Sequence, residues 1–238
     1  MSAVISLNSI KIIEGALIRN NRKIKAVIFD IDGVIYDDNK ELIDYQKKTA
    51  QILGLRIPSD IEIFRLFGKS WTEIIDQLWP GVDSEEYKKA WFKLVGDKLD
   101  YLPLNDRVRE TLEKLKKKFI LGVVSGGHRD WILVRFKNDS LTDFFDVIVS
   151  GDDTEKHKPN GEPILYACQK LNIKPEECVY IGDNIIDYEA AKDADVHFIG
   201  FIWDGIEHGL FDNIQLNSRV YSFREIPKEI EKIEKNIM

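Results

Sequence analysis

Two aspartates one residue apart follow directly after the most strand-like run of this sequence. Residues 26–29 read Ala-Val-Ile-Phe, and such β-branched and aromatic side chains suit a buried strand. If Ile31 continues the alternation of the strand, Asp30 and Asp32 point roughly the same way. Two carboxylates so close repel each other unless a cation or a shared proton relieves them. The segment therefore predicts a strand end with a hard-metal site and an oxygen nucleophile, although an aspartate-capped turn is the structural alternative.

Two further apolar runs end in residues that suit an anion. Residues 119–124 precede Ser125 and Gly126, whose hydroxyl and backbone N–H groups can contact an anionic oxygen; an ordinary loop is the alternative. Residues 145–149 lead into a polar loop with Lys158, which could neutralise a phosphate or remain a solvated surface lysine. Both runs therefore predict strands that end in possible phosphate ligands.

A fourth run, residues 178–181, is followed by a second pair of acids. Asp183 would stand at the end of the strand, and Asp187 would lie one helical turn later on the same side, unless it serves only as a helix cap. In an open α/β sheet, ligands collect outside the carboxyl ends of the strands. The joint occurrence of these four strand ends therefore predicts a single site.

On these motifs the chain resembles the hydrolases of the haloacid dehalogenase superfamily, in the phosphatase branch with a helical cap to which phosphoglycolate phosphatases belong. The four motifs are Asp30-x-Asp32-Gly33-Val34, Ser125, Lys158-Pro159 and Gly182-Asp183-x-x-x-Asp187. The resemblance covers about residues 24–203. One departure lies in the third motif, where two extra residues separate Pro159 from Pro163 compared with many relatives. We therefore choose Lys158 over Lys156 as the lysine of the site.

The resemblance implies a Rossmann-like three-layer α/β sandwich around a parallel sheet, with an inserted all-α cap domain. The core domain is expected in residues 1–37 and 105–238, and the cap in residues 38–104. Gly and Pro breaks divide the insertion into helical segments, which agrees with this expectation. Helices are expected at residues 40–53, 61–67, 71–78, 84–99, 106–118 and 224–237. Residues 1–23 carry only a weak hairpin pattern.

The resemblance also implies a role for each acidic motif residue. Asp30 would be the nucleophile that becomes an aspartyl phosphate. Asp32 would be the general acid towards the leaving oxygen and then the general base towards water. Mg²⁺ would be held by Asp30, the backbone carbonyl of Asp32, Asp183 and Asp187.

The remaining site residues are expected to hold the substrate. Ser125, Gly126 and Lys158 would bind the phosphate oxygens. Lys69, at a turn between two expected helices, could reach a second anionic group such as a carboxylate, or remain in solvent. The cap residues predicted to contact substrate are Lys69, Arg65 and Trp71.

Composition restricts the partners of the chain. The net charge of −7 disfavours nucleic acid and anionic membranes, and no apolar stretch approaches the roughly 18 residues of a membrane span. Cys168 and Cys178, expected in a helix and the following strand, offer neither a disulfide framework nor a zinc pattern. The first residues lack the layout of a signal peptide. These features predict a cytoplasmic protein. The resemblance implies a small phosphorylated metabolite as the binding partner, and the chain is expected to be a monomer or a homodimer.

The leading functional hypothesis is a Mg²⁺-dependent phosphatase, with a phosphoglycolate-type substrate as the nearest guess. A pyrophosphatase or nucleotidase would use the same chemistry. A sugar-phosphate mutase is disfavoured, because the His, Lys and Arg of that subgroup correspond here to Leu42, Phe67 and Trp71. A non-catalytic binding protein that uses its cap as an interface is disfavoured, because it would have no need of all four of Asp30, Asp32, Lys158 and Asp183.

Overall fold

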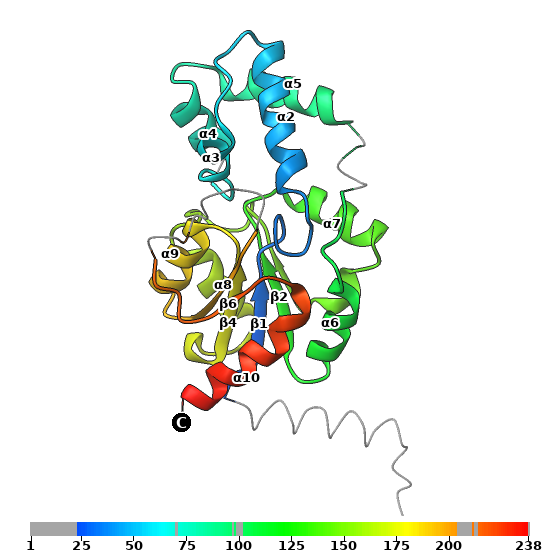
Figure 1. Cartoon of the computed structure of the whole chain (residues 1–238), viewed down its shortest axis with the longest axis vertical. Coiled ribbons are helices and arrows are strands. Elements are labelled where there is room, and N and C mark those ends of the chain that lie inside the picture. The colour runs from blue at the N-terminus through cyan, green and yellow to red at the C-terminus, as the bar shows by residue number, and fades with distance from the viewer. Residues whose placement is uncertain are drawn as a thin grey trace, which may run out of the picture.

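A single parallel sheet organises the structure. The computed structural model describes residues 23–69, 71–96, 98, 102–203, 211 and 214–237. Within them, six strands pair in parallel in the order β3-β2-β1-β4-β5-β6 (Figure 1). The strands are β1 (Ala26–Phe29), β2 (Ile120–Val124), β3 (Val147–Val149), β4 (Cys178–Gly182), β5 (His197–Phe201) and β6 (Arg219–Val220). The first four confirm the predicted strands, whereas β5 and β6 were not predicted.

Strand β1 lies inside the sheet and is buried on both faces. All four of its residues are buried, and it pairs with β2 on one side and β4 on the other. Val27 and Phe29 join one hydrophobic cluster, and Ile28 joins another. Because both faces are covered, the strand is continuously apolar instead of alternating with polar residues.

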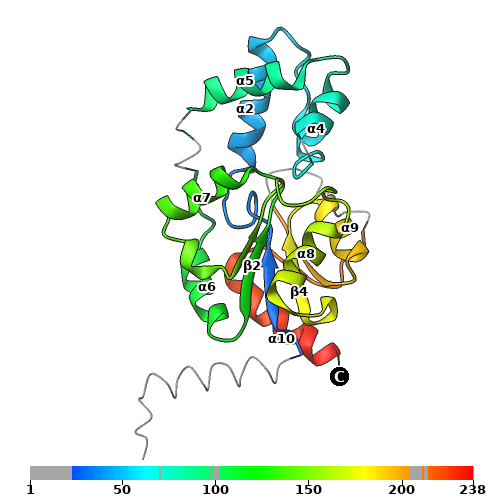
Figure 2. The same ribbon diagram turned by 180° about the vertical axis from the view of Figure 1, so that it is seen from behind.

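Helices cover the two faces of the sheet, as Figures 1 and 2 show from opposite sides. On one face of the sheet, Val27 and Phe29 belong to the same hydrophobic cluster as Leu112 and Ile230. On the other face, Ile28 belongs to a cluster with Ile164 and Ala190. The first layer contains α6 (Val108–Lys116) and α10 (Ile226–Asn236), and the second contains α8 (Glu162–Leu171) and α9 (Ile185–Asp193). The predicted α/β sandwich is therefore confirmed.

Four helices lie beyond the carboxyl ends of the strands, at the top of Figure 1. They are α2 (Asn39–Ile52), α3 (Asp60–Phe64), α4 (Trp71–Leu78) and α5 (Ser84–Val95). They fall within the predicted insertion, and α4 has the predicted bounds. The helix predicted over residues 84–99 ends earlier, at Val95, because Gly96 takes a φ of 47° that helix interiors do not allow. The limits of this region as a domain stay a prediction.

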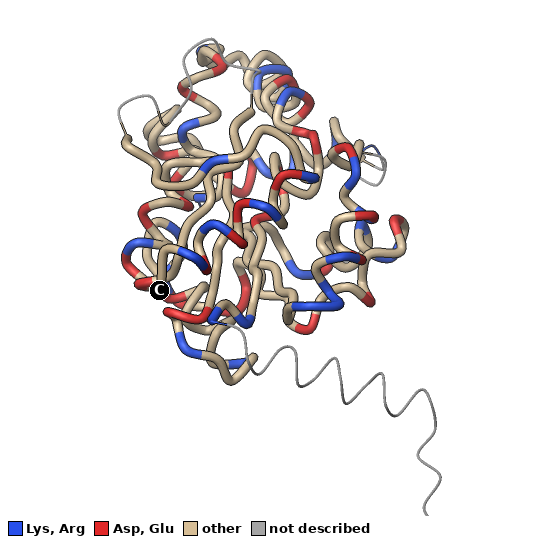
Figure 3. Tube along the Cα trace, turned by 60° about the horizontal axis from the view of Figure 1, so that its bottom comes forward, with Lys and Arg blue, Asp and Glu red and all other residues tan. Residues whose placement is uncertain are grey.

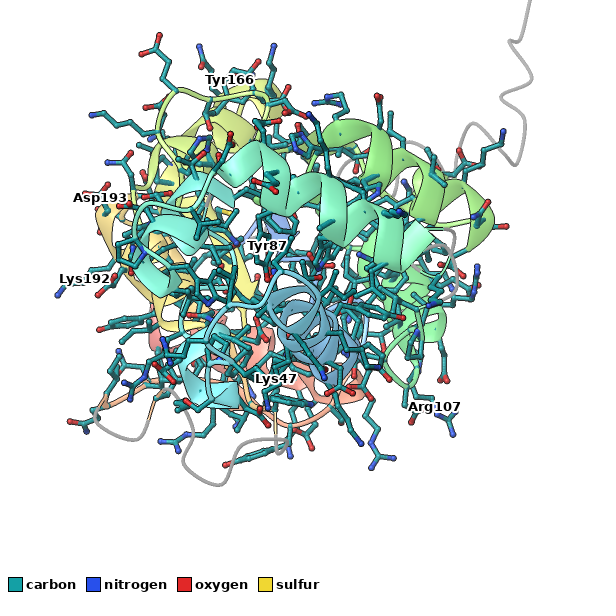
Figure 4. The ribbon with its side chains drawn as sticks, turned by 90° about the horizontal axis from the view of Figure 1, so that it is seen from above. Lys47, Tyr87, Arg107, Tyr166, Lys192 and Asp193 are labelled. Carbon is teal, nitrogen blue, oxygen red and sulfur yellow. The ribbon has the colours of Figure 1, made fainter. Side chains whose placement is uncertain are left out.

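Aromatic side chains form the interior of this helical region. The hydroxyl of Tyr87 donates to Oε1 of Gln46 at 2.8 Å, and Figure 4 places Tyr87 near the middle of this end of the molecule. Trp79 stacks on Tyr87 with the ring centroids 4.8 Å apart and donates its Nε1–H to the carbonyl of Arg56 at 2.7 Å. Trp79 and Tyr87, which pack together in the interior of this helical region, thus also have hydrogen-bond partners for their polar groups.

The described surface mixes charges of both signs. Figure 3 shows Lys and Arg interspersed with Asp and Glu along the trace. None of the helices in the described ranges is long and apolar enough to cross a membrane. Cys168 lies on α8 and Cys178 on β4, as predicted. The weak hairpin pattern predicted before residue 23 lies outside the described residues.

Candidate active site

The carboxyl ends of three neighbouring strands bring the predicted site residues together. Asp30 follows β1, Ser125 follows β2, and Asp183 lies just beyond β4. Because β1 lies between β2 and β4 and all three run in parallel, these buried side chains gather at one edge of the sheet. Lys158 reaches the same place from the loop between β3 and α8. The structure thus unites residues of all four motifs.

Lys158 joins the first and fourth motifs. Its Nζ lies 2.8 Å from Oδ1 of Asp30 and 2.7 Å from Oδ1 of Asp187, and the residue is only 2% exposed. Tyr180 accepts an N–H of Lys158 at 3.2 Å and donates its own hydroxyl to Asp187 at 3.0 Å. Burial lowers the pKa of Lys158, but the two carboxylates outweigh burial and hold it well above its ordinary value. Lys156, in contrast, is exposed.

The buried carboxyl groups are costly to ionise. Burial raises the pKa of Asp30 to about 7, against the lowering effect of Lys158, and the charges of Asp187 and Asp32 raise it further. Burial also raises the pKa of Asp183 well above its ordinary value, although Asn39 donates Nδ2–H to its Oδ2 at 2.7 Å. Additional positive charge at this place would therefore stabilise the ionised acids.

The acidic side chains fit a hard divalent cation. Asp30, Asp183 and Asp187 each offer one oxygen, and these oxygens lie within 4.8 Å of one another. When all three are ionised, these carboxylates carry three negative charges against the single positive charge of Lys158, and a divalent cation would balance the remaining two. Carboxylate oxygens are the ligands that Mg²⁺ prefers. Gly33 makes room for the group, because a Cβ there would come within 2.0 Å of Oδ2 of Asp183.

An arginine that the sequence did not indicate holds Asp32. Arg135, on α7 (Arg129–Asn138), donates from Nη1 to Oδ1 of Asp32 at 2.6 Å and from Nη2 to Oδ2 of Asp38 at 2.6 Å. Its guanidinium carbon lies 3.7 Å from the ring centroid of Tyr36. Burial lowers the pKa of Arg135, but the two carboxylates outweigh it and keep the guanidinium charged. Asp38 is fully buried and also accepts the N–H of Gly33 at 2.9 Å.

The segment after α3 closes over the loop that follows β2. A Cβ on Gly126 would come within 2.7 Å of the carbonyl oxygen of Gly68, so the two backbones nearly touch. The side-chain amide of Asn184 donates to the carbonyl of Phe64 at 2.7 Å and ties the end of α3 to the sheet edge. Ser125 accepts the N–H of Gly127 at 3.1 Å, which fixes its hydroxyl in the same loop. Lys69 is thereby brought close to Ser125 and Gly126 in the loop that follows β2.

A cavity of about 100 Å³ lies between this edge of the sheet and the helical region. Lys69 and Trp71 line it, together with Ser125 and Gly126. Arg65, which directly follows α3, is exposed and is not among the described residues that line the cavity. Its predicted contact with substrate therefore has no support in this arrangement. The other lining residues are Asp30, Asp32, Leu42, Gln46, Phe67, Gly68, Ile74, Trp91, Gly127, Trp131, Arg135, Asp183, Asn184 and Asp187.

Sequence reasoning missed the partners that surround the motif acids. Asn39 and Asp38 lie only a few residues beyond the first motif, and an Asp-Asn pair at the start of a predicted helix was an available signal, although their burial is visible only in the structure. Asn184 directly follows Asp183 and forms a capping box with Asp187 at the start of α9. Arg135 had no such signal, since it lies far along the chain from Asp32.

Comparison with known proteins places these motifs in a family. The sequence profile described as haloacid dehalogenase-like hydrolase matches residues 27–201. The pyrophosphatase PpaX of Listeria innocua is 31% identical over 191 residues, which are 78% of this chain and 88% of that protein.

Two solved structures share the architecture. The putative β-phosphoglucomutase of Thermotoga maritima is 26% identical, with a TM-score of 0.67 over 88% of this chain and 100% of that one. A predicted phosphoglycolate phosphatase of Haemophilus somnus superposes with a TM-score of 0.73 at 20% identity, over 87% of this chain and 98% of the other, which shows the fold alone.

Proposed function

This chain belongs to the haloacid dehalogenase-like hydrolases, and we propose that it is a Mg²⁺-dependent phosphatase of a small phosphorylated metabolite, acting through an aspartyl phosphate. The observation that supports this most is the buried meeting of Asp30, Lys158, Asp183 and Asp187 beside a cavity. Buried charges of both signs are costly to fold and cluster at functional sites.

Asp30 would act as the nucleophile. One of its carboxylate oxygens would attack phosphorus while the bond to the alcohol oxygen breaks, and water would later release phosphate from the aspartyl group. Lys158 lowers the pKa of Asp30 and so favours the ionised form that attack requires. Ser125, the N–H of Gly126 and Lys158 would hold the other phosphate oxygens, where preorganised donors act most strongly.

The metal would be held by carboxylates of the first and fourth motifs. The proposed ligands are Asp30, the backbone carbonyl of Asp32, Asp183 and Asp187. When bound, Mg²⁺ offsets the repulsion between an anionic nucleophile and an anionic phosphoryl group.

Asp32 would move the protons. It would give a proton to the leaving oxygen and later take one from the hydrolytic water. Its side chain is 34% exposed and lines the cavity. Arg135 orients it by a charge-assisted hydrogen bond, which favours the ionised form that accepts the proton of water. Residues 38–104 would act as the cap, since the contact between Gly68 and Gly126 covers the phosphate loop and limits the access of water.

The proposed substrate is a small phosphomonoester, and phosphoglycolate is the nearest example within the family. Pyrophosphate is the second candidate, because the relative from Listeria innocua is named a pyrophosphatase. Both would use the same nucleophile and the same metal ligands.

The test is Mg²⁺-dependent phosphate release from a panel of phosphorylated metabolites, with Asp30→Asn as the control. We expect turnover to be lost on chelation and to fall by about 10⁴-fold or more in the variant, as nucleophile removal does elsewhere. Turnover within a few-fold of wild type in Asp30→Asn would refute the nucleophile. No release from any compound by the folded protein would favour a binding protein instead.

A further inference from the structure

We propose that the alcohol part of the substrate is an uncharged ring that packs against tryptophans of the cavity and accepts a hydrogen bond from the indole of Trp91. The inference rests on the proposed phosphatase function, but it replaces the two anionic candidates named there, phosphoglycolate and pyrophosphate, by an uncharged class of leaving group. Both a sugar ring and an aromatic ring have this chemistry, since each presents apolar C–H or π faces and can carry an acceptor oxygen.

Part of the wall of the cavity is aromatic. Trp71 on α4, Trp91 on α5 and Trp131 on α7 all line it. The ring centroids of Trp71 and Trp91 are 4.9 Å apart with an interplanar angle of 71°, and those of Trp91 and Trp131 are 5.2 Å apart with an angle of 51°. The three indoles therefore form one aromatic cluster in which the rings meet edge to face or tilted. Leu42 and Ile74 extend it with aliphatic side chains. Such a cluster presents both ring faces and ring edges, against which the apolar faces of a ring can pack.

Trp91 also offers an unused donor. The residue is 2% exposed, and its Nε1–H has no acceptor within the described structure. A buried indole N–H ordinarily finds a partner, as that of Trp79 does on the carbonyl of Arg56. Gln46, whose carbonyl oxygen is already held by Tyr87, lines the same cavity. An acceptor on the ring of the substrate would satisfy the indole.

The cations around the cavity argue against a second anionic group on the substrate. Lys158 is paired with two carboxylates, and Arg135 is paired with two others. Among the described residues that line the cavity, only Lys69 carries a positive charge without an ion pair. A second phosphate or a carboxylate would have to leave water and lie against indoles with this one flexible cation as partner. A neutral ring carries no such cost.

The experiment compares four substrates that share a phosphate but differ in the group beside it. Benzyl phosphate and glucose 6-phosphate each carry a ring one methylene from the phosphate, whereas phosphoglycolate and pyrophosphate carry a second anionic group. We expect kcat/KM with Mg²⁺ to be at least about tenfold higher on one of the ring esters than on either anionic compound. A higher value for glucose 6-phosphate assigns a sugar ring, and a higher value for benzyl phosphate assigns an aromatic one.

Two single substitutions separate the indole N–H from general packing. Trp91→Phe keeps an aromatic ring but loses the donor, and we expect it to lower kcat/KM on glucose 6-phosphate about tenfold more than on benzyl phosphate, the effect of one neutral hydrogen bond. Trp79→Phe also removes an indole N–H, but Trp79 is not among the described residues that line the cavity. We expect the order of the four substrates to stay unchanged in Trp79→Phe.

Equilibrium binding of the same four compounds, followed by intrinsic tryptophan fluorescence, distinguishes failure of the phosphatase function from failure of the ring subsite. Tighter binding of a ring ester without any turnover would overturn the phosphatase and leave the ring subsite standing. Turnover that is highest on phosphoglycolate or pyrophosphate would overturn the ring subsite and leave the phosphatase standing. Equal effects of Trp91→Phe and Trp79→Phe on the order of substrates would also overturn it.

Discussion

Replacing Arg135 by methionine is expected to be among the most destabilising single changes in this protein. Methionine has a similar length but neither charge nor donors. The substitution would leave Asp38, which is fully buried, without the guanidinium that lies 2.6 Å away. It would also free Asp32 and remove the cation from the face of Tyr36.

The expected loss follows from burial. Breaking a buried ion pair by removing one partner costs about 3–5 kcal/mol, because the remaining charge is uncompensated. The side chain of Arg135 is 7% exposed and those of Asp38 and Asp32 are 0% and 34% exposed, so Asp38 accounts for most of the loss. For a chain of this length, roughly 2–4 °C per kcal/mol corresponds to a melting temperature lowered by about 6–20 °C.

Urea unfolding of wild type and variant, followed by circular dichroism, measures the change in the free energy of unfolding. Arg107→Met is the matched control: its guanidinium lies 2.9 Å from Glu110, but both side chains are about half exposed. Figure 4 shows Arg107 at the edge of the molecule, pointing outwards. Because solvent screens such a pair, we expect Arg107→Met to unfold at nearly the wild-type urea concentration.

The double variant Arg135→Met/Asp38→Asn tests the cause of the loss. A neutral amide is less costly to bury than a carboxylate, so the double variant should be more stable than Arg135→Met alone. A loss below about 1 kcal/mol in Arg135→Met, or no recovery in the double variant, would refute the assignment of the energy to the buried charge.

Three further predictions concern the site. Gly126→Ala should lower turnover on every substrate at least about tenfold, because the added Cβ would come within 2.7 Å of the carbonyl oxygen of Gly68. Gly127→Ala is the control and should stay near wild type, because its added Cβ has its closest contact at 3.4 Å. Similar rates in the two variants would contradict the close approach of residue 68 to the loop after β2. Without Mg²⁺, Asp30 keeps its proton in the folded state between pH 3.8 and about 7, whereas the unfolded chain loses it. The free energy of unfolding should therefore fall as the pH rises through this range. Mg²⁺ needs the ionised acids and should therefore raise the melting temperature more at pH 8 than at pH 5; an equal rise at both would argue against the carboxylate site. Lys69→Ala should change the ranking of substrates, measured as relative kcat/KM, more than Arg65→Ala does, because Lys69 lines the cavity and Arg65 is not among its described lining residues. An unchanged ranking in Lys69→Ala would mean that Lys69 does not contact the substrate.

The sequence by itself determined the strands that carry chemistry and the order of the motifs along the chain. A buried parallel strand such as β1 must be apolar on both faces, and its signal is therefore local and readable. Asp30, Ser125 and Asp183 were predicted for the same reason, since each directly follows such a run and parallel strands end at one edge of the sheet. Turn and cap residues placed the ends of the six predicted helices to within four residues, whereas α7 and α8 were given no bounds from the sequence.

Only the tertiary structure decided which side chains surround these acids. Arg135 meets Asp32 across 103 positions of the chain, and Trp131 joins Trp91 from a different helix. Strands β5 and β6 also escaped prediction. The physical reason is that a charge pair or a ring contact depends on the distance between atoms after folding, and spacing along the chain carries no record of that distance. Burial turns such a contact into a strong one, because it removes the water that would otherwise screen or replace it.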